Sequence, residues 1–139
     1  MLKFENTEDK TYLVNLLSGG DIIKFEKDYK NNFDFRPVKI KRREFNKNRE
    51  KFYKILVEKY GNNCQLKLSY KCLKNKNLQI DHLIPLSSNV LNKILRNKKA
   101  KKGKKVITQS LGSNHINNLV LACKKCNGFK KHRIIPIRL

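Results

Sequence analysis

Four cysteines lie in two pairs, Cys64 with Cys72 and Cys123 with Cys126. Two residues separate the second pair, a spacing that lets one tight turn aim both sulfurs at the same metal ion. The first pair, with seven residues between its cysteines, is a weaker signal on its own. Together the pairs are typical of a structural zinc site with four thiolate ligands, which we expect here. Four free buried thiols are the alternative.

The pair Asp81-His82 lies inside a short apolar stretch, LQIDHLIP, over residues 78–85. Residues 59–139 contain 19 Lys and Arg but one acidic residue, Asp81, whereas residues 1–58 contain 14 Lys and Arg and 10 acidic residues. A surface almost free of carboxylates favours binding to a polyanion, because surface acids repel phosphate. The retained Asp81 therefore indicates a functional role, and its neighbour is a histidine that can exchange protons near neutral pH.

Composition limits the class of protein that can carry these residues. The chain has 139 residues, a net charge of +22, 39% hydrophobic residues and 32% charged residues. This length suits a single domain with a thin core, and the charge favours a nucleic-acid partner. No apolar run is long enough for a membrane span or a secretion signal. We therefore expect a soluble cytoplasmic protein with no membrane partner, whose cysteines bind metal and form no disulfides.

Hydrophobic patterning predicts an α+β fold. We expect helices over residues 7–17, 44–60 and 88–96, strands over 78–85 and 118–122, and a turn leading into a helix over 123–131. Residues 21–29 are ambiguous between helix and strand, residues 37–43 are expected to be a basic connector, and 98–105 a basic loop. Adjacent residues of a regular strand point to opposite faces, so the strand must end, twist or bulge for Asp81 and His82 to share one pocket.

From Cys64 to Lys131 the sequence resembles the HNH endonucleases, also called ββα-metal or His-Me finger nucleases. The resemblance is carried by IDHLIPLS over 80–87, NLVLACKKCN over 118–127, and Lys130. The chain departs from the family in the long spacing of its first cysteine pair, and it has Asn127 where many members have histidine. The resemblance implies a zinc-stabilised ββα-metal finger over residues 61–139. Residues 1–60 then form an added, mostly helical segment.

The same resemblance implies a set of site residues. Asp81 and Asn127 would hold a catalytic Mg²⁺ or Mn²⁺, since both offer hard oxygen ligands. His82 would be the general base. Asn118 would orient the loop that carries the histidine, unless it is only a turn residue at the start of the strand. Lysines near the site and in the basic loop would contact DNA phosphates, unless they are simply solvated: Lys130, Lys131, Lys101, Lys102, Lys104 and Lys105.

These expectations define a function. We expect a metal-dependent endonuclease that hydrolyses double-stranded DNA to 5′-phosphate and 3′-hydroxyl ends, with a restriction endonuclease as the first interpretation. A homing or phage-encoded HNH endonuclease is the alternative within the same chemistry, and a non-catalytic, zinc-dependent nucleic-acid-binding protein is the alternative from another class. Sequence recognition would come from residues 1–60, from the basic loop or from a homodimer.

Overall fold

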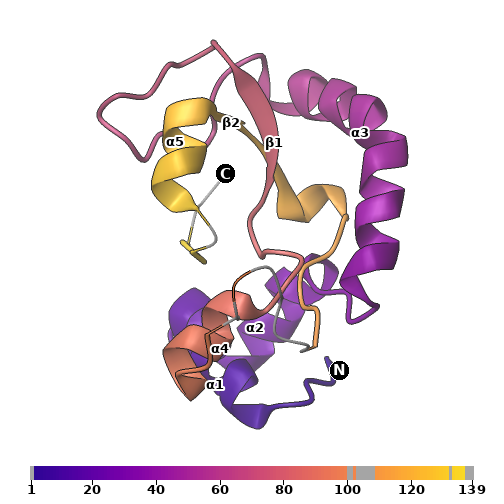
Figure 1. The fold of residues 1–139 in the computed structure, drawn as a ribbon, viewed down its shortest axis with the longest axis vertical. Helices are drawn as coiled ribbons and strands as arrows, with labels where there is room; N and C mark the ends of the chain where they lie inside the picture. Colours follow the sequence, from indigo (N-terminus) through magenta and orange to yellow (C-terminus); the bar gives the residue numbers. More distant parts are fainter. Residues whose placement is uncertain (1, 100–101, 103–108, 132, 137–139) are drawn as a thin grey trace.

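The computed structural model describes residues 2–99, 102, 109–131 and 133–136. Its elements confirm the α+β class (Figure 1). In chain order they are α1 (Thr7–Ser18), α2 (Ile22–Tyr29), a 3-10 turn (Lys30–Asn32), α3 (Val38–Tyr60), β1 (Leu78–His82), α4 (Asn89–Arg96), a second 3-10 turn (Ile116–Asn118), β2 (Leu119–Cys123) and α5 (Lys124–Lys130). In the part of the chain that is described, no helix is both long and apolar enough to cross a membrane.

The two strands form an antiparallel sheet that lies between two helices. Ile80 of β1 pairs with Leu121 of β2, and His82 pairs with Leu119. The sheet has α3 on one side and α5 on the other (Figure 1). Because both faces of β2 are covered, all of its residues are buried, which explains its uninterrupted apolar sequence.

Helix α3 begins at Val38, so the expectation of a connector over residues 37–43 is wrong. Pro37 directly precedes the first turn, where a missing backbone N–H costs nothing and a φ of −55° suits the helix. Lys41, in the next turn, is fully buried, and its ammonium group donates hydrogen bonds to the carbonyls of Asp34 and Gly112. A basic stretch that reads as a solvated connector therefore carries one lysine that ties α3 to two loops.

Residues 21–29, ambiguous from the pattern, form α2. The Asp21 side chain accepts a hydrogen bond from the backbone N–H of Lys24 at 3.0 Å, which caps the helix. Phe25 on α2 is fully buried with Leu13 of α1 and Leu91 of α4. This cluster joins the first thirty-odd residues to α4 and its flanking loops. A second cluster packs Leu56 of α3 against β2. Both clusters therefore contain residues from either side of residue 60, the boundary expected between the helical segment and the finger.

Candidate metal centre and catalytic cleft

The four cysteines converge at one point. Their sulfur atoms all lie within 4.8 Å of one another. The Sγ atoms of Cys72 and Cys123 are 3.9 Å apart. A zinc ion bound tetrahedrally with Zn–S bonds of about 2.3 Å requires sulfur atoms about 3.8 Å apart, so the arrangement fits such an ion. The cluster can hold a metal ion such as zinc, as the cysteine spacing predicted.

Local structure explains how the long first pair reaches the cluster. The backbone N–H of Cys64 donates to the carbonyl of Lys74 at 2.7 Å, which closes the loop that contains Cys72. Cys123 ends β2, and Cys126 lies in the first turn of α5. Backbone N–H groups point at the sulfurs, from Leu73 and Cys126 to Cys123, and from Lys74 to Cys72, at 3.3–3.4 Å. These bonds stabilise thiolates, the form that binds metal.

Electrostatics also favours a cation at this point. Burial opposes ionisation of Cys123, but hydrogen bonds from the backbone N–H groups of Cys126 and Leu73 lower the pKa of its thiol to about 6. Burial, together with the neighbouring sulfurs of Cys123 and Cys72, raises the pKa of the Cys126 thiol to about 12. Four thiolates so close together therefore need a metal ion to offset their mutual repulsion.

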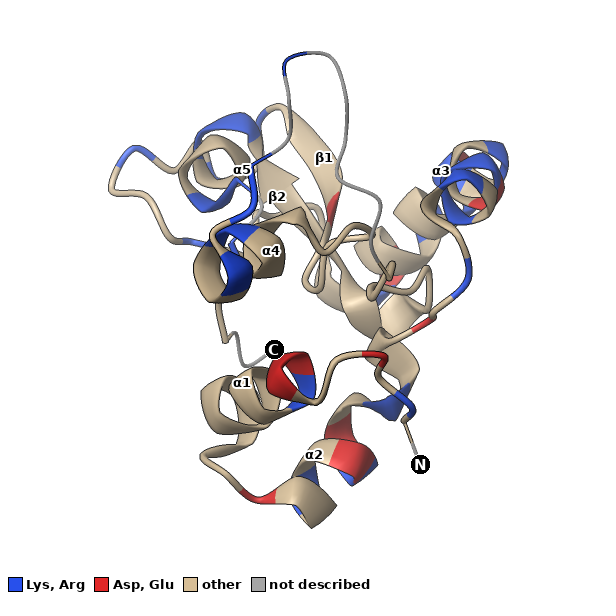
Figure 2. Cartoon of the chain, turned by 60° about the horizontal axis from the view of Figure 1, so that its bottom comes forward, with Lys and Arg blue, Asp and Glu red and all other residues tan. Residues whose placement is uncertain are grey.

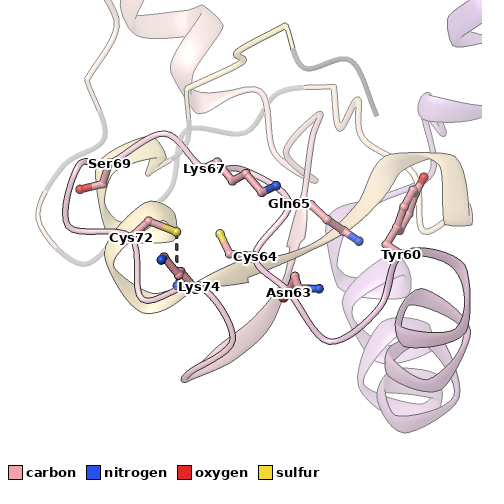
Figure 3. Close-up of a pocket in the computed structure, with 8 residues that line it drawn as sticks. All are labelled: Tyr60, Asn63, Cys64, Gln65, Lys67, Ser69, Cys72 and Lys74. Atoms are coloured by element: carbon pink, nitrogen blue, oxygen red, sulfur yellow. Dashed lines mark hydrogen bonds between the residues drawn. The ribbon is translucent and has the colours of Figure 1, made fainter.

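An open cleft of about 730 Å³ lies beside the cysteine cluster. Figure 3 shows Cys64 and Cys72 with their sulfurs directed to a common space, while Tyr60 at the end of α3 and two lysines, Lys67 and Lys74, line the surrounding surface. Neither Asp81 nor His82 lines this cleft. This cleft borders the cysteine cluster, and the Asp81-His82 pair lies elsewhere.

A second cleft, of about 400 Å³, contains the Asp81-His82 pair. Its walls come from α3, from the loop after β1 and from the end of α5. The lining residues are Arg42, Phe45, Asn46, Arg49, Asp81, His82, Pro85, Leu86, Ser87, Lys130 and Lys131.

Asp81 and His82 reach this second cleft from opposite faces of one strand. Both residues are paired in regular register with β2, so no bulge separates them. However, β1 ends at His82 and does not continue to residue 85 as expected. The cleft lies at this strand end, between α3 and α5, where the two faces meet. Ending the strand is therefore enough to bring both side chains to one place.

His82 is held from two sides. Its Nε2 atom lies 2.9 Å from Oδ1 of Asn114, and its ring meets the Phe45 ring edge to face with centroids 4.8 Å apart. The Asn114 amide is oriented by its own Nδ2, which donates to the Lys41 carbonyl at 2.8 Å. Burial lowers the pKa of His82 below its usual 6.5, although the Asn114 bond and the Asp81 charge act in the opposite direction. The imidazole is therefore neutral at pH 7.

Asn114 was not identified from the sequence. It lies in the polar segment LGSNHINN, over residues 111–118, where nothing in residue type separates it from three other asparagine and serine side chains. Its contact with His82 spans 32 positions, and its contact with Lys41 spans 73. Only the folded chain brings these groups together.

Asn118 fastens the loop that follows the histidine. Its fully buried side chain accepts from the backbone N–H of Ile84 at 2.8 Å and donates to the carbonyls of Ile84 and Ser113 at 3.0 and 2.8 Å. Gly112 lies against the same loop, and a Cβ atom there would be 2.0 Å from the Ile84 carbonyl oxygen. The chain after His82 is thus held by a buried amide and by a close backbone approach.

Lys130 is not on the exposed surface where a phosphate contact was expected. Its side chain is 1% exposed, and its Nζ atom lies 3.0 Å from Oδ2 of Asp81. The same ammonium group donates to the His82 carbonyl at 3.1 Å. The sequence predicts a solvated side chain here, because Lys130 lies one turn from the cysteine cluster on a helix that is rich in lysine. In the fold, α5 turns this position inward, against the end of β1.

Asn127 does not line the second cleft with Asp81. Its Nδ2 atom donates to Oε1 of Gln79 at 3.1 Å. Gln79 precedes Asp81 by two residues on β1, and Asn127 precedes Lys130 by three residues on α5. The contacts Gln79–Asn127 and Asp81–Lys130 therefore follow one another along the seam where β1 lies against α5. The structure therefore places both expected metal ligands on one seam, each already in contact with a protein group.

The remaining expected DNA-contacting lysines divide into two groups. Lys131 is exposed and lines the second cleft, and Lys102 is exposed in a turn. Lys101, Lys104 and Lys105 lie outside the described residues.

Comparisons with known proteins add no relative to these observations. Searches against protein-family models, curated proteins and solved structures found no match.

Proposed function

We propose that this protein is a metal-dependent DNA endonuclease of the HNH type, stabilised by a zinc ion on its four cysteines. The proposal is carried by one observation: Asp81, His82 and the exposed Lys131 line one cleft, with α3 as its basic wall, in a chain that also contains a four-cysteine cluster. A carboxylate can bind a cation, a neutral imidazole can act as a base and surrounding positive charge can bind phosphate, so this set of groups can support phosphodiester hydrolysis.

His82 acts as the general base in this proposal. Because Nε2 faces the oxygen of Asn114, Nε2 carries the ring proton and Nδ1 is left as the basic nitrogen. Nδ1 takes a proton from the attacking water, whose oxygen bonds to phosphorus while the bond from phosphorus to the 3′ oxygen breaks. The leaving 3′ oxygen takes a proton from solvent, so the products are a 5′-phosphate and a 3′-hydroxyl. Asn114 and Phe45 hold the ring for this transfer, and Asn118 holds the chain beyond it.

The catalytic cation, Mg²⁺ or Mn²⁺, would be held by Asp81 and Asn127. The donor set fits in type, since a carboxylate and an amide oxygen are ligands that hard cations prefer. Asn127 uses Nδ2 for its bond to Gln79, so its Oδ1 is not the atom engaged there. Lys130 engages Oδ2 of Asp81 in an ion pair, so the cation would bind the other carboxylate oxygen, Oδ1. When bound, the cation would offset charge on the phosphate and assist the leaving oxygen.

One observation favours a second candidate, a zinc-dependent nucleic-acid-binding protein without catalysis. Both expected metal ligands already have protein partners, Asp81 in an ion pair with Lys130 and Asn127 in a hydrogen bond with Gln79. A seam satisfied in this way needs no further cation to be stable. Under this alternative, the cleft binds phosphate but does not hydrolyse it.

Plasmid cleavage separates the two candidates. Purified protein is incubated with supercoiled plasmid and Mg²⁺, Mn²⁺ or Ca²⁺, and the ends of any product are mapped chemically. The endonuclease proposal predicts nicked or linear DNA with 5′-phosphate and 3′-hydroxyl ends when Mg²⁺ or Mn²⁺ is added. If no cation supports cutting by folded, zinc-loaded protein that binds DNA, the second candidate is correct.

The biological role that we propose is restriction. A restriction enzyme of this size would act as a homodimer on a short palindromic site, since the symmetry of a dimer matches that of its site. A homing or phage-encoded endonuclease would instead cut a long asymmetric site. Sequencing the ends produced on a DNA of high complexity distinguishes these alternatives.

A further inference from the structure

We propose that the cleft-facing side of α3 is a phosphate-binding surface, with Arg42 and Arg49 gripping the nucleic-acid strand that enters the catalytic cleft. This inference rests on the proposed function for its partner, duplex DNA, but not on catalysis. It gives a role to a helix that precedes the part of the chain resembling a nuclease.

The position of these residues on the helix is the first support. Arg42, Asn46 and Arg49 recur at intervals of four and three residues, so they lie on one face of α3. All three are exposed, and all three line the cleft that contains Asp81 and His82. The arginines therefore lie across the cleft from the hydrolytic pair, on the other side from α5.

The charge of this face is the second support. Helix α3 contains three acidic residues, Glu44, Glu50 and Glu58, and none of them lines the cleft. Glu44 is paired with Arg36, away from the cleft. Among the described residues, neither Arg42 nor Arg49 forms an ion pair. Figure 2 shows lysine and arginine along α3, α4 and α5, and acidic residues on α1, α2 and α3. Two unneutralised guanidinium groups are thus available to an anion.

Arg49 is held ready for such a contact. Its guanidinium group lies over the Phe45 ring, 5.4 Å from the centroid, and donates to Oδ1 of Asn46 at 2.6 Å. Both contacts restrict the side chain without neutralising its charge. The same Phe45 ring packs against His82, so the arginine and the proposed base share one support. A restricted arginine loses less conformational entropy when it binds phosphate.

The spacing of the two arginines matches a nucleic-acid backbone. Seven residues of α-helix span about 10 Å, since each residue rises 1.5 Å. One strand of B-form DNA rises 3.4 Å per nucleotide along the helix axis, and its neighbouring phosphates lie farther apart than this rise because the strand winds around the axis, so about one or two intervals between phosphates span a comparable distance. Arg42 and Arg49 can therefore contact phosphates on either side of the one presented to His82. Planar guanidinium groups suit this role, because they bind phosphate oxygens in pairs.

The test measures DNA binding by matched variants without added divalent cation, so that no cutting occurs. Fluorescein-labelled 30-base-pair duplex DNA is titrated with the parent, with Arg42→Gln/Arg49→Gln, and with Arg43→Gln/Lys51→Gln, over a series of NaCl concentrations. The last variant removes the same charge from exposed positions of α3 that do not line the cleft. Zinc content and thermal unfolding are measured on each protein to verify its fold.

We expect the Arg42/Arg49 variant to bind roughly 10- to 100-fold more weakly near 0.1 M salt. Its slope of log affinity against log salt should be shallower by about 2, because each lost phosphate contact removes about 0.9. The control variant should keep the parental slope. Equal losses in both variants, or no loss in either, would overturn the proposal. Failure of the parent to cut plasmid would overturn only the proposed function, because binding is read separately.

Discussion

The buried contact between Lys130 and Asp81 gives the sharpest prediction about stability. We consider Lys130→Met, which keeps the length and the apolar part of the side chain but removes its charge. The Lys130 side chain is 1% exposed and the Asp81 side chain is 15% exposed, so neither charge is freely solvated. At their separation of 3.0 Å, the Coulomb attraction is about 5 kcal/mol at an effective dielectric of 20.

The desolvation cost of burying both groups offsets part of that attraction, but loss of one partner leaves the other charge uncompensated. We therefore expect Lys130→Met to lower the free energy of unfolding by about 2–4 kcal/mol. Asp81→Asn and the double variant complete a cycle, in which we expect a coupling energy of about 1–3 kcal/mol. Lys131→Met is the matched control, because its exposed side chain forms no ion pair among the described residues, and it should change stability by less than about 0.5 kcal/mol.

Urea unfolding of zinc-loaded protein, followed by circular dichroism, measures all four variants. DNA titrations on the same preparations separate burial from the phosphate contact that was first expected of Lys130. A buried partner of Asp81 predicts a large loss of stability and an unchanged salt slope. Parental stability in Lys130→Met, with a slope shallower by about 1, would refute the structural reasoning and restore the phosphate contact.

Three further predictions follow from the same geometry. Gly112→Ala should lower the free energy of unfolding by about 1–3 kcal/mol, because its Cβ would lie 2.0 Å from a backbone oxygen. Gly128→Ala, whose Cβ would meet no atom within 4 Å, should raise the free energy of unfolding by about 0.5–1 kcal/mol in the same urea assay. Equal effects of the two substitutions would contradict this prediction. Because His82 must be neutral to act as a base and burial lowers its pKa, the cleavage rate should not change with pH near pH 7 and should fall only at pH values below 6.5, the usual pKa of histidine. Asn114→Ala should slow cutting about tenfold and move this fall in rate to lower pH. An inflection of the parental rate above pH 6.5 would contradict the role of His82 as the base. Metal analysis should find about one zinc per chain. Cys123→Ser should abolish cooperative unfolding, because zinc binding contributes about 10–16 kcal/mol, whereas the free energy of unfolding of a typical protein is about 5–15 kcal/mol. A folded protein that contains no zinc would contradict this prediction.

The parts of the site that were predictable from sequence are those encoded by local spacing. The two residues between Cys123 and Cys126 predict a metal-binding pair, and zinc's preference for four thiolate ligands predicts that this pair lies close to the first one. The strand that contains Asp81 is visible as an apolar run, and its partner strand as a second one. Asn118 ends the 3-10 turn that directly precedes β2, and its side chain forms hydrogen bonds to the loop after His82. The loop-orienting role that the resemblance implied stays a prediction.

The parts that were not predictable depend on burial of single polar groups. Lys41 and Lys130 are two among many lysines, and nothing in their neighbours distinguishes a buried ammonium from a solvated one. Asn114 acquires its role through two contacts distant in sequence. The arginines of α3 were hidden for a related reason: a helix with charge on several faces shows which face is used only when the cleft beside it is known.

Removal of the proposed base is the most direct test of the central claim, hydrolysis by His82. Single-turnover cleavage of plasmid with Mg²⁺ is compared between the parent and His82→Ala, with zinc content and DNA affinity measured on the same contaminant-controlled preparations. We predict that His82→Ala folds, retains its zinc and binds DNA nearly as the parent does, while its cleavage rate falls by roughly 10² to 10⁴. Cleavage by His82→Ala at the parental rate would contradict the claim.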